Sequence, residues 1–292
     1  MSTILITGGG RGLGRFTALA LAQQGHHVIF TARNPAQGQA ALEDFRRAAP
    51  KALVELRVLD LARLESVRAF AAQLNAQQVA LDVLVNCAGI MQQSPQRRLT
   101  ADGFEETLGV NVLAPVLLTR LLLPALAKAP AARVVNVSSR MHLPGSRGAP
   151  VAYDFGDPHL TAGYHPERAY KNSKLAMLWF TYELARRITP RTITVNAVCP
   201  GFVPATAAQV THGVMRFIMR HVMPWMPFAT SAAAATRSFV FMAVDPSLNG
   251  VTGTFYADLK PIPSSPESLD AAKAARFFDW AQQVTAAPAW PG

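Results

Sequence analysis

The strongest constraint on the fold is the order in which two kinds of segment alternate along the chain. Short apolar runs rich in β-branched residues alternate with longer segments rich in alanine and leucine. Such alternation is typical of βαβ units, which build a parallel sheet covered by helices. The apolar runs are continuous rather than interrupted by a polar residue at every second position, which indicates strands buried on both faces.

Seven segments are predicted as strands: Thr3–Thr7, Val28–Thr31, Leu53–Leu59, Leu81–Asn86, Arg133–Ser138, Thr192–Val198 and Gly253–Tyr256. The segments predicted as helices are Leu13–Gln24, Ala36–Ala48, Leu64–Gln77, Thr100–Lys128, Pro166–Ile188, Ser231–Val244 and Asp270–Val284. No linker rich in proline, glycine and serine divides the chain before Pro261–Pro266. We therefore expect one α/β domain over residues 1–292, with a doubly wound parallel sheet of about seven strands and helices on both faces.

Composition excludes several other classes of protein. Hydrophobic residues make up 50% of the chain and charged residues 16%, which excludes a disordered chain. The formal net charge is +10, which raises the question of a nucleic acid or a membrane surface as partner. The arginines are scattered rather than clustered with aromatic residues, so no nucleic-acid partner is expected. The two cysteines, Cys87 and Cys199, lack metal-ligand spacing, so no metal is expected.

Two observations bear on localisation. The chain goes from Met1 straight into an apolar strand and a glycine cluster, without the pattern of a signal peptide, so a cytoplasmic protein is expected. The most apolar long segment, Val110–Ala127, is interrupted by Asn111, Pro115 and Arg120. This interruption predicts a buried helix rather than a membrane span.

A glycine cluster joins the first predicted strand to the first predicted helix. The run reads Thr7-Gly8-Gly9-Gly10-Arg11-Gly12-Leu13-Gly14. Glycines at such a turn let the backbone approach a pyrophosphate, and the helix N-terminus supplies free N–H groups and the positive end of its dipole. A cluster between a strand and a helix predicts a dinucleotide site and therefore a Rossmann-type fold.

The end of the second predicted strand indicates which dinucleotide to expect. A site for NAD normally has an acid there, which binds the ribose 2′-hydroxyl, but this strand ends Phe30-Thr31-Ala32-Arg33-Asn34. The planar guanidinium of Arg33 can pair with a 2′-phosphate, and Arg11 can approach the same phosphate from the glycine cluster. The alternative is that both arginines point into solvent. We expect NADP(H) as the cofactor.

Several motifs in the same order resemble those of the short-chain dehydrogenase/reductase family, from Thr3 to about Tyr256. They are the spacing Thr-Gly-x-x-x-Gly-x-Gly, an acid after the third strand, Asn86-Cys87-Ala88-Gly89 after the fourth strand and Pro200-Gly201 after the sixth. Cys87 departs from the family pattern, which has a second asparagine there. The resemblance implies these cofactor contacts: Gly8, Arg11, Gly12, Leu13, Gly14, Arg33, Asp60, Leu61, Asn86, Ala88, Gly89, Tyr170, Lys174, Pro200, Gly201 and Val203.

Tyr170 and Lys174 form the predicted acid–base pair. Four residues separate them on the helix predicted at Pro166–Ile188, so their side chains share one face. A nearby ammonium stabilises a phenolate, which makes reversible proton transfer by tyrosine easier near neutral pH. The resemblance implies that Ser139 binds the substrate oxygen, with Ser138 as the alternative.

Asn111 is the fourth residue of the catalytic set that the resemblance implies, and its role is to hold a water of a proton relay. Pro115 lies four residues later and has no N–H, so in a helix the carbonyl of Asn111 loses its usual partner and could bind that water. The alternative is that Pro115 only kinks a packed helix. With these four residues, the resemblance implies hydride transfer between a nicotinamide and a carbonyl or alcohol carbon.

The segment between Ser139 and Tyr170 is longer than in small members of the family. This insert, residues 140–169, and the closing helix Asp270–Val284 resemble the retinol-dehydrogenase-like branch. The branch implies a bulky, often apolar carbonyl or alcohol, such as a retinoid, polycyclic or polyketide-like compound. Residues 202–229 are expected to form a substrate lid. The expected substrate contacts are Ser139, Tyr170, Met215, Met219 and Trp225.

Other interpretations remain open. The lid residues could instead pack in the core, contact a partner or touch a membrane surface peripherally. A double-bond reductase similar to protochlorophyllide reductases is an alternative function, and a non-catalytic dinucleotide sensor on the same fold is another. The expected partner is a small carbonyl or alcohol substrate, and the protein is expected to be a monomer or a homodimer.

Overall fold

The strands in the part of the chain that the structure describes all belong to one sheet. The computed structural model describes residues 1–144, 151, 153–188, 192–207, 211 and 213–290. Parts of the insert (145–150 and 152) and of the lid (208–210 and 212) therefore lie outside the described residues. The strands are β1 (Thr3–Ile6), β2 (His27–Ala32), β3 (Val54–Val58), β4 (Val83–Asn86), β5 (Ala132–Val137), β6 (Ile193–Cys199), β7 (Phe255–Ala257) and β8 (Lys260–Pro261).

The order of the strands is β3-β2-β1-β4-β5-β6-β7-β8. All neighbours from β3 to β7 pair in parallel, as predicted. The sequence did not predict β8, a two-residue edge strand that pairs antiparallel with β7. The chain order reverses between β1 and β4, and a crevice outside the carboxyl ends of the strands at such a reversal is where open α/β sheets bind ligands.

The principal helices match the predicted segments to within about two residues at each end, except in one case. They are α1 (Gly12–Gln23), α2 (Pro35–Ala48), α3 (Leu64–Ala76), α5 (Ala114–Leu126), α6 (Pro166–Arg187), α9 (Ala232–Val244) and α11 (Ala271–Val284). The shorter helices are α4 (Glu106–Leu108), α7 (Pro204–Ala207), α8 (Gly213–His221) and α10 (Pro266–Leu269).

The exception is the helix predicted at Thr100–Lys128, which begins later than expected. Gly103 has a φ of +83°, a left-handed conformation that interrupts a right-handed helix. The carboxylate of Glu105 then accepts hydrogen bonds from the N–H groups of Thr107 and Leu108 at 2.9 and 2.7 Å, which caps α4. The helical stretch therefore starts at Glu106, because this cap satisfies the first N–H groups there.

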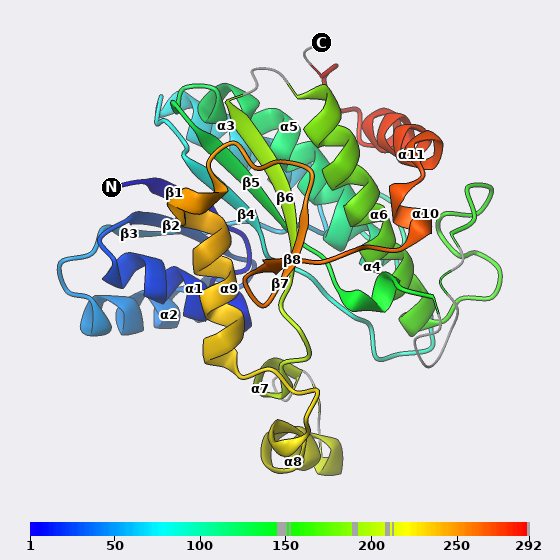
Figure 1. Cartoon of the computed structure of the whole chain (residues 1–292), viewed down its shortest axis with the longest axis horizontal. Helices are drawn as coiled ribbons and strands as arrows, with labels where there is room; N and C mark the ends of the chain where they lie inside the picture. Colours follow the sequence, from blue (N-terminus) through cyan, green and yellow to red (C-terminus); the bar gives the residue numbers. More distant parts are fainter. Residues whose placement is uncertain (145–150, 152, 189–191, 208–210, 212, 291–292) are drawn as a thin grey trace.

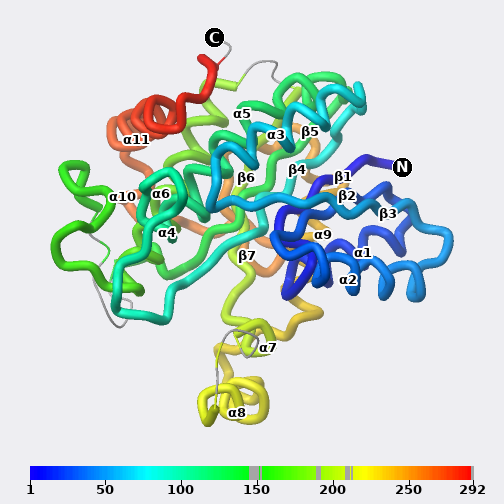
Figure 2. Tube along the Cα trace, turned by 180° about the vertical axis from the view of Figure 1, so that it is seen from behind, coloured from blue at the N-terminus to red at the C-terminus, as the bar shows by residue number. Residues whose placement is uncertain are grey.

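Alternate residues of the central strands face different helical layers. Ile4 and Ile6 of β1 pack with α1, α2 and α9, whereas Leu5 between them packs with α3, α5, α6 and α11. Figures 1 and 2, which view the molecule from opposite sides, show these two sets of helices on the two faces of the sheet. This double cover explains why the strands read as continuous apolar runs.

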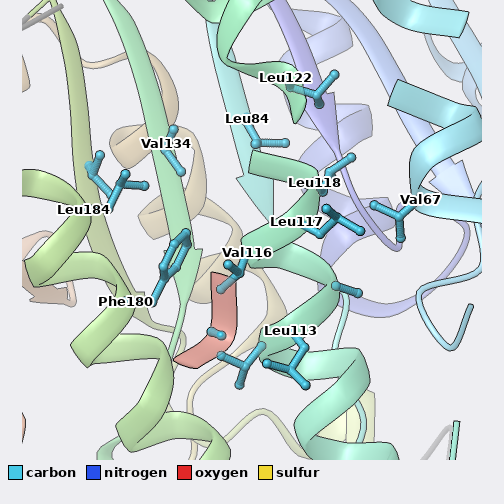
Figure 3. Packing of buried hydrophobic residues seen from close by; sticks show 14 of the residues in the cluster. Val67, Leu84, Leu113, Val116, Leu117, Leu118, Leu122, Val134, Phe180 and Leu184 are labelled. Atoms are coloured by element: carbon cyan, nitrogen blue, oxygen red, sulfur yellow. The ribbon is translucent and has the colours of Figure 1, made fainter. Parts of the chain in front are cut away.

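The core on the α5 side is the larger of the two layers. Figure 3 shows Leu117 and Leu118 of α5 facing Val67 of α3 and Leu84 of β4, all of them fully buried. The segment Glu106–Leu126 is long and apolar enough to span a membrane, but 83% of its most apolar stretch is buried inside the protein. Such burial is typical of a core helix of a globular domain.

We expect Leu118→Ala to lower the free energy of unfolding by about 2–5 kcal/mol, because the truncation leaves a cavity in a close-packed layer. Chemical denaturation followed by circular dichroism measures this change. Leu269→Ala is the matched control, since Leu269 is 61% exposed, and it should change the free energy of unfolding by less than about 0.5 kcal/mol. Equal effects of the two substitutions would contradict this account of the core.

Candidate active site

The glycine turn between β1 and α1 brings two stretches of backbone unusually close together. A Cβ atom on Gly14 would lie 2.6 Å from the carbonyl oxygen of Gly8, and one on Gly8 would lie 3.0 Å from the Cα of Ala88. Only glycine fits at either position without displacing backbone. The helix starts at Gly12, after an N-cap residue, Arg11, whose side chain makes no capping hydrogen bond. The first N–H groups of α1 are thus available to an anion.

Thr7 joins the carboxyl ends of β1 and β4 at this turn. Its Oγ1 accepts hydrogen bonds from the N–H groups of Cys87 and Ala88, both at 3.0 Å. On the other side, the N–H of Gly8 donates to Oγ1 of Thr31 at 3.2 Å. These two threonines position the turn, and sequence reasoning did not single them out. The sequence signal that could have identified them is a threonine near the carboxyl end of each of two neighbouring strands.

Arg11 and Arg33 each follow a residue of the close contact between the glycine turn and the end of β2. A Cβ atom on Gly10 would lie 3.0 Å from the Cβ of Ala32. Both arginines are exposed. No acid stands at the end of β2, and a guanidinium group can bind a phosphate through a planar pair of N–H donors.

The turn after β3 lies next to the end of β2. The N–H of Leu59 donates to the carbonyl oxygen of Ala32 at 3.1 Å, which brings Asp60 close to the end of β2. Asp60 shapes its own turn, since its Oδ1 accepts from the N–H of Ala62 at 3.0 Å and its N–H donates to Oγ of Ser66 at 3.0 Å. Leu61 is buried beneath this turn.

The two ends of the predicted lid, residues 202–229, meet next to the end of β6. Phe202 forms a parallel bridge with Ala229, and the N–H of Thr230 donates to the carbonyl oxygen of Phe202 at 2.7 Å. Pro200 and Gly201 lie between the end of β6 and this bridge, and Val203 follows it as a buried residue. All three predicted residues therefore lie beyond the carboxyl edge of the sheet.

Ser139, Tyr170 and Lys174 come together at the end of β5 and along α6. The phenol of Tyr170 forms a hydrogen bond with the side chain of Ser139, and the ammonium nitrogen of Lys174 lies 5.2 Å from the centre of the Tyr170 ring. Lys174 Nζ also donates to the carbonyl oxygen of Val137 at 3.0 Å. The hydroxyl of Ser138 is used differently, because it donates to the main-chain oxygen of Lys174 at 2.8 Å.

Asn111 lies in a π turn, Gly109–Leu113, immediately before α5. Pro115 has no N–H to offer the carbonyl of Asn111, and the wider turn is a common adjustment at functional sites. The Asn111 side chain is held by Ile90, whose N–H donates to Oδ1 at 2.7 Å and whose carbonyl accepts from Nδ2 at 2.9 Å. Nδ2 also donates to Oγ of Ser173 at 3.1 Å.

Gly89 connects Asn111 to Lys174. A Cβ atom on Gly89 would lie 3.3 Å from Oδ1 of Asn111 and 3.7 Å from Nζ of Lys174. The two polar side chains therefore border the same glycine, from the π turn on one side and from α6 on the other. The structure thus gathers Asn111, Ser139, Tyr170 and Lys174 at one edge of the sheet.

A buried polar network supports the strand ends below this set. Asn86 Nδ2 donates to Oδ1 of Asn136 at 2.8 Å and to Oγ1 of Thr119 at 3.1 Å. Asn136 Nδ2 continues the chain to Oγ1 of Thr181 at 3.0 Å. Asn86 was predicted as a cofactor contact, and in the structure its amide nitrogen links β4 to α5 and β5. Sequence reasoning missed the three other members of this network, Thr119, Asn136 and Thr181, which belong to separate elements.

Burial changes the acidity of the two titratable groups of the set. Burial raises the pKa of Tyr170 to about 12, and the hydrogen bond from Ser139 opposes that rise. Burial lowers the pKa of Lys174 to about 8, since a cation loses its hydration there. Near neutral pH, Tyr170 is therefore a phenol able to donate a proton, and Lys174 is close to its own titration.

The lid lies apart from this set. Figures 1 and 2 show α7 and α8 beyond the carboxyl edge of the sheet, projecting from the body of the molecule. Met215 is 49% exposed and Trp225 is 84% exposed, while Met219 is half-buried. The structure does not bring these three predicted substrate residues against Ser139 or Tyr170.

The described part of the insert packs on α6 and α11. Tyr153 and Phe155 lie with their rings 5.2 and 5.6 Å from the Trp179 ring, and Tyr153 lies 5.7 Å from Phe277 of α11. The insert and the closing helix therefore belong to one aromatic cluster. Across the ranges described above, no three His, Cys, Asp or Glu side chains are placed to hold a metal ion.

Comparisons with known proteins agree on one family. A family model described as short chain dehydrogenase matches residues 2–152, and one described as Enoyl-(Acyl carrier protein) reductase matches residues 158–258. Retinol dehydrogenase 14 of Homo sapiens is 35% identical over 291 residues, covering 95% of this chain and 84% of that protein. Polyprenol dehydrogenase of Homo sapiens is 35% identical over 257 residues, covering 86% and 75%.

Solved structures show the same architecture. An uncharacterised protein from Mycobacterium paratuberculosis has a TM-score of 0.76 at 32% identity, covering 100% of this chain and 96% of that one. An actinorhodin polyketide ketoreductase solved with NADPH has a TM-score of 0.66 at 22% identity, covering 88% and 95%. At that identity, the likeness to the ketoreductase concerns the fold alone.

We expect the kcat/KM of the reductive reaction for the cofactor to fall as pH rises through about 8. Lys174 has a lowered pKa of about 8, so it carries its charge below that pH and loses it above. Because kcat/KM reports the free enzyme, a pH profile of initial rates at low cofactor concentration measures this titration. A profile that stays flat to pH 10 would show that Lys174 does not titrate in this way.

Proposed function

Because the chain belongs to the short-chain dehydrogenase/reductase family, we propose that it is an NADP(H)-dependent oxidoreductase that interconverts a carbonyl and an alcohol on a bulky, apolar substrate. Membership of the family establishes an NAD(P)-dependent oxidoreductase. The observation that carries the proposal is the contact of Ser139 with Tyr170, beside Lys174 and Asn111 at the carboxyl edge of the sheet.

The residues at the glycine turn fit the pyrophosphate of a dinucleotide. The close approach of Gly14 to Gly8 leaves no side chain above the first turn of α1, where a pyrophosphate would be held by N–H groups. Arg11 and Arg33 support the choice of NADP(H), because a 2′-phosphate would give both guanidinium groups a partner. A bound nicotinamide would supply or accept the hydride.

The side chains of this protein carry the proton chemistry. In the reductive direction, Tyr170 donates its phenolic proton to the substrate oxygen, and Ser139 donates a hydrogen bond to the same oxygen as negative charge develops there. The Lys174 ammonium stabilises the phenolate left on Tyr170. Asn111 borders Gly89 together with Lys174, and this proximity supports a role for Asn111 in holding a relay water that would pass a proton to Lys174.

The names of the similar proteins support an apolar substrate. Retinol and polyprenol dehydrogenases are named for long, apolar alcohols, and they match most of this chain. A panel of aldehydes and ketones with NADPH tests the class, with retinal and a prenyl aldehyde set against small ketones. Reduction of a conjugated carbon–carbon double bond in place of the carbonyl would favour a double-bond reductase, and the two products differ in mass spectrum and absorbance.

We expect Tyr170→Phe to lower kcat on the order of 10²–10⁴-fold while leaving the dissociation constant for NADPH unchanged. The variant keeps the ring above Lys174 and removes only the proton donor. Steady-state kinetics and a fluorescence titration of NADPH measure the two quantities. Tyr182→Phe is the matched control on the same helix, and its hydroxyl bonds Ser264 instead. A Tyr170→Phe enzyme with most of its turnover would remove Tyr170 from the mechanism.

We expect Arg33→Ala to weaken NADPH binding roughly 10–100-fold and to leave NADH binding almost unchanged, because only NADPH has the 2′-phosphate. Arg46→Ala is the control, since Arg46 is an exposed arginine in the last turn of α2, whereas Arg33 precedes the first turn of this helix. Isothermal titration with both cofactors measures the preference. Equal affinities of the unmodified protein for NADPH and NADH would reject the assignment of Arg33 and Arg11.

A further inference from the structure

Residues 213–228, called here the α8 arm, expose apolar side chains on a projection from the body. The arm contains α8 and the short helical turn Met223–Trp225. No residue of α8 is buried, and only Ile218 and Met219 are half-buried. Large apolar side chains are among the most exposed in the protein: Val214 at 76%, Phe217 at 61%, Trp225 at 84% and Phe228 at 61%.

The charge of the arm is entirely positive. Arg216 and Arg220 lie one turn apart on α8, and residues 184–244 contain no aspartate or glutamate. On a helical projection the two arginines occupy one side, and Val214 with Ile218 occupies the opposite side. His221 follows, with its ring 4.7 Å from that of Phe217. The arm is therefore amphipathic, with cations flanking an apolar surface.

We propose that the α8 arm docks on the surface of an anionic lipid bilayer. An amphipathic helix with apolar residues on one side and arginines on the other lies in the headgroup region, where it buries the apolar side and leaves the cations among anionic headgroups. Trp225 suits that depth because its ring is apolar and its N–H is polar. The formal net charge of +10 attracts the whole molecule to such a surface.

A second copy of the chain fits this surface less well. The nine residues of α8 make a helix only about 14 Å long, so α8 alone is too short for the roughly 800 Å² that each partner buries in a stable interface. Pairing two arms would also bring four arginines together without an acid on either arm. An anionic bilayer has no such repulsion, and its contact does not depend on a matching shape.

Docking would place the active-site edge against the bilayer. The arm leaves the body beyond the carboxyl edge of the sheet (Figures 1 and 2). Ser139 follows the carboxyl end of β5 at this edge and contacts Tyr170. An apolar substrate dissolved in lipid would then reach the edge without crossing water. Docking does not involve the catalytic residues, so the proposal stands whatever substrate the site accepts.

The experiment measures binding of the purified full-length protein to vesicles by sedimentation. We expect binding to vesicles of phosphatidylcholine with phosphatidylserine, weaker binding to phosphatidylcholine alone, and a blue shift of tryptophan fluorescence that is lost in Trp225→Phe. Arg216→Gln with Arg220→Gln should raise the lipid concentration for half-binding roughly tenfold. Val214→Ser with Phe217→Ser should abolish the binding.

Matched variants keep the test specific to the arm. Arg46→Gln with Arg47→Gln on α2 removes the same charge elsewhere and should raise the half-binding concentration far less. Thermal unfolding checks that every variant is folded. Equal losses from the two arginine pairs would overturn the proposal, since attraction would then reflect net charge alone. It would also be overturned by equal binding to both kinds of vesicle, or by a dimer in solution that Val214→Ser with Phe217→Ser dissociates.

Discussion

Lys174 carries a cation that is 5% exposed, and much of the site is arranged to keep that cation in place. Its ammonium bonds the carbonyl of Val137 at the end of β5, and its main-chain oxygen is held by Ser138. Both contacts tie α6 to the carboxyl end of one strand. Tyr170, one turn earlier on α6, is thereby placed beside Ser139. Burying a cation without such partners would cost free energy. These contacts therefore fix how α6 packs against the carboxyl end of β5.

The double cover of the sheet imposes the rest of the arrangement. Because helices bury both faces, polar side chains on the central strands must find partners inside, as Asn86 and Asn136 do. Only the carboxyl edge leaves strand ends available for chemistry. The π turn at Asn111 adds a fourth polar side chain there from the α5 side, and the cap at Glu105 sets where that helical stretch begins.

Much of the architecture could be predicted because it rests on local patterns. The apolar runs predicted seven parallel strands, and helical spacing placed Tyr170 and Lys174 on one face of α6. Prediction failed where a distant or unusual contact decided the outcome. The helix predicted from Thr100 begins at Glu106, because Gly103 adopts a left-handed conformation and Glu105 caps the first turn. The edge strand β8 is too short to have a pattern of its own.

The sequence by itself determined the order of strands and helices along the chain, the glycine turn and the placement of Tyr170 and Lys174 on one helix face. Each of these depends on spacing between residues that are near one another in the chain. The tertiary structure alone decided that the Ser139 hydroxyl meets Tyr170 while the Ser138 hydroxyl binds Lys174, and that the α8 arm projects with its apolar side chains exposed. Those outcomes depend on how the sheet places strand ends and helices that are far apart in sequence, which no local pattern records.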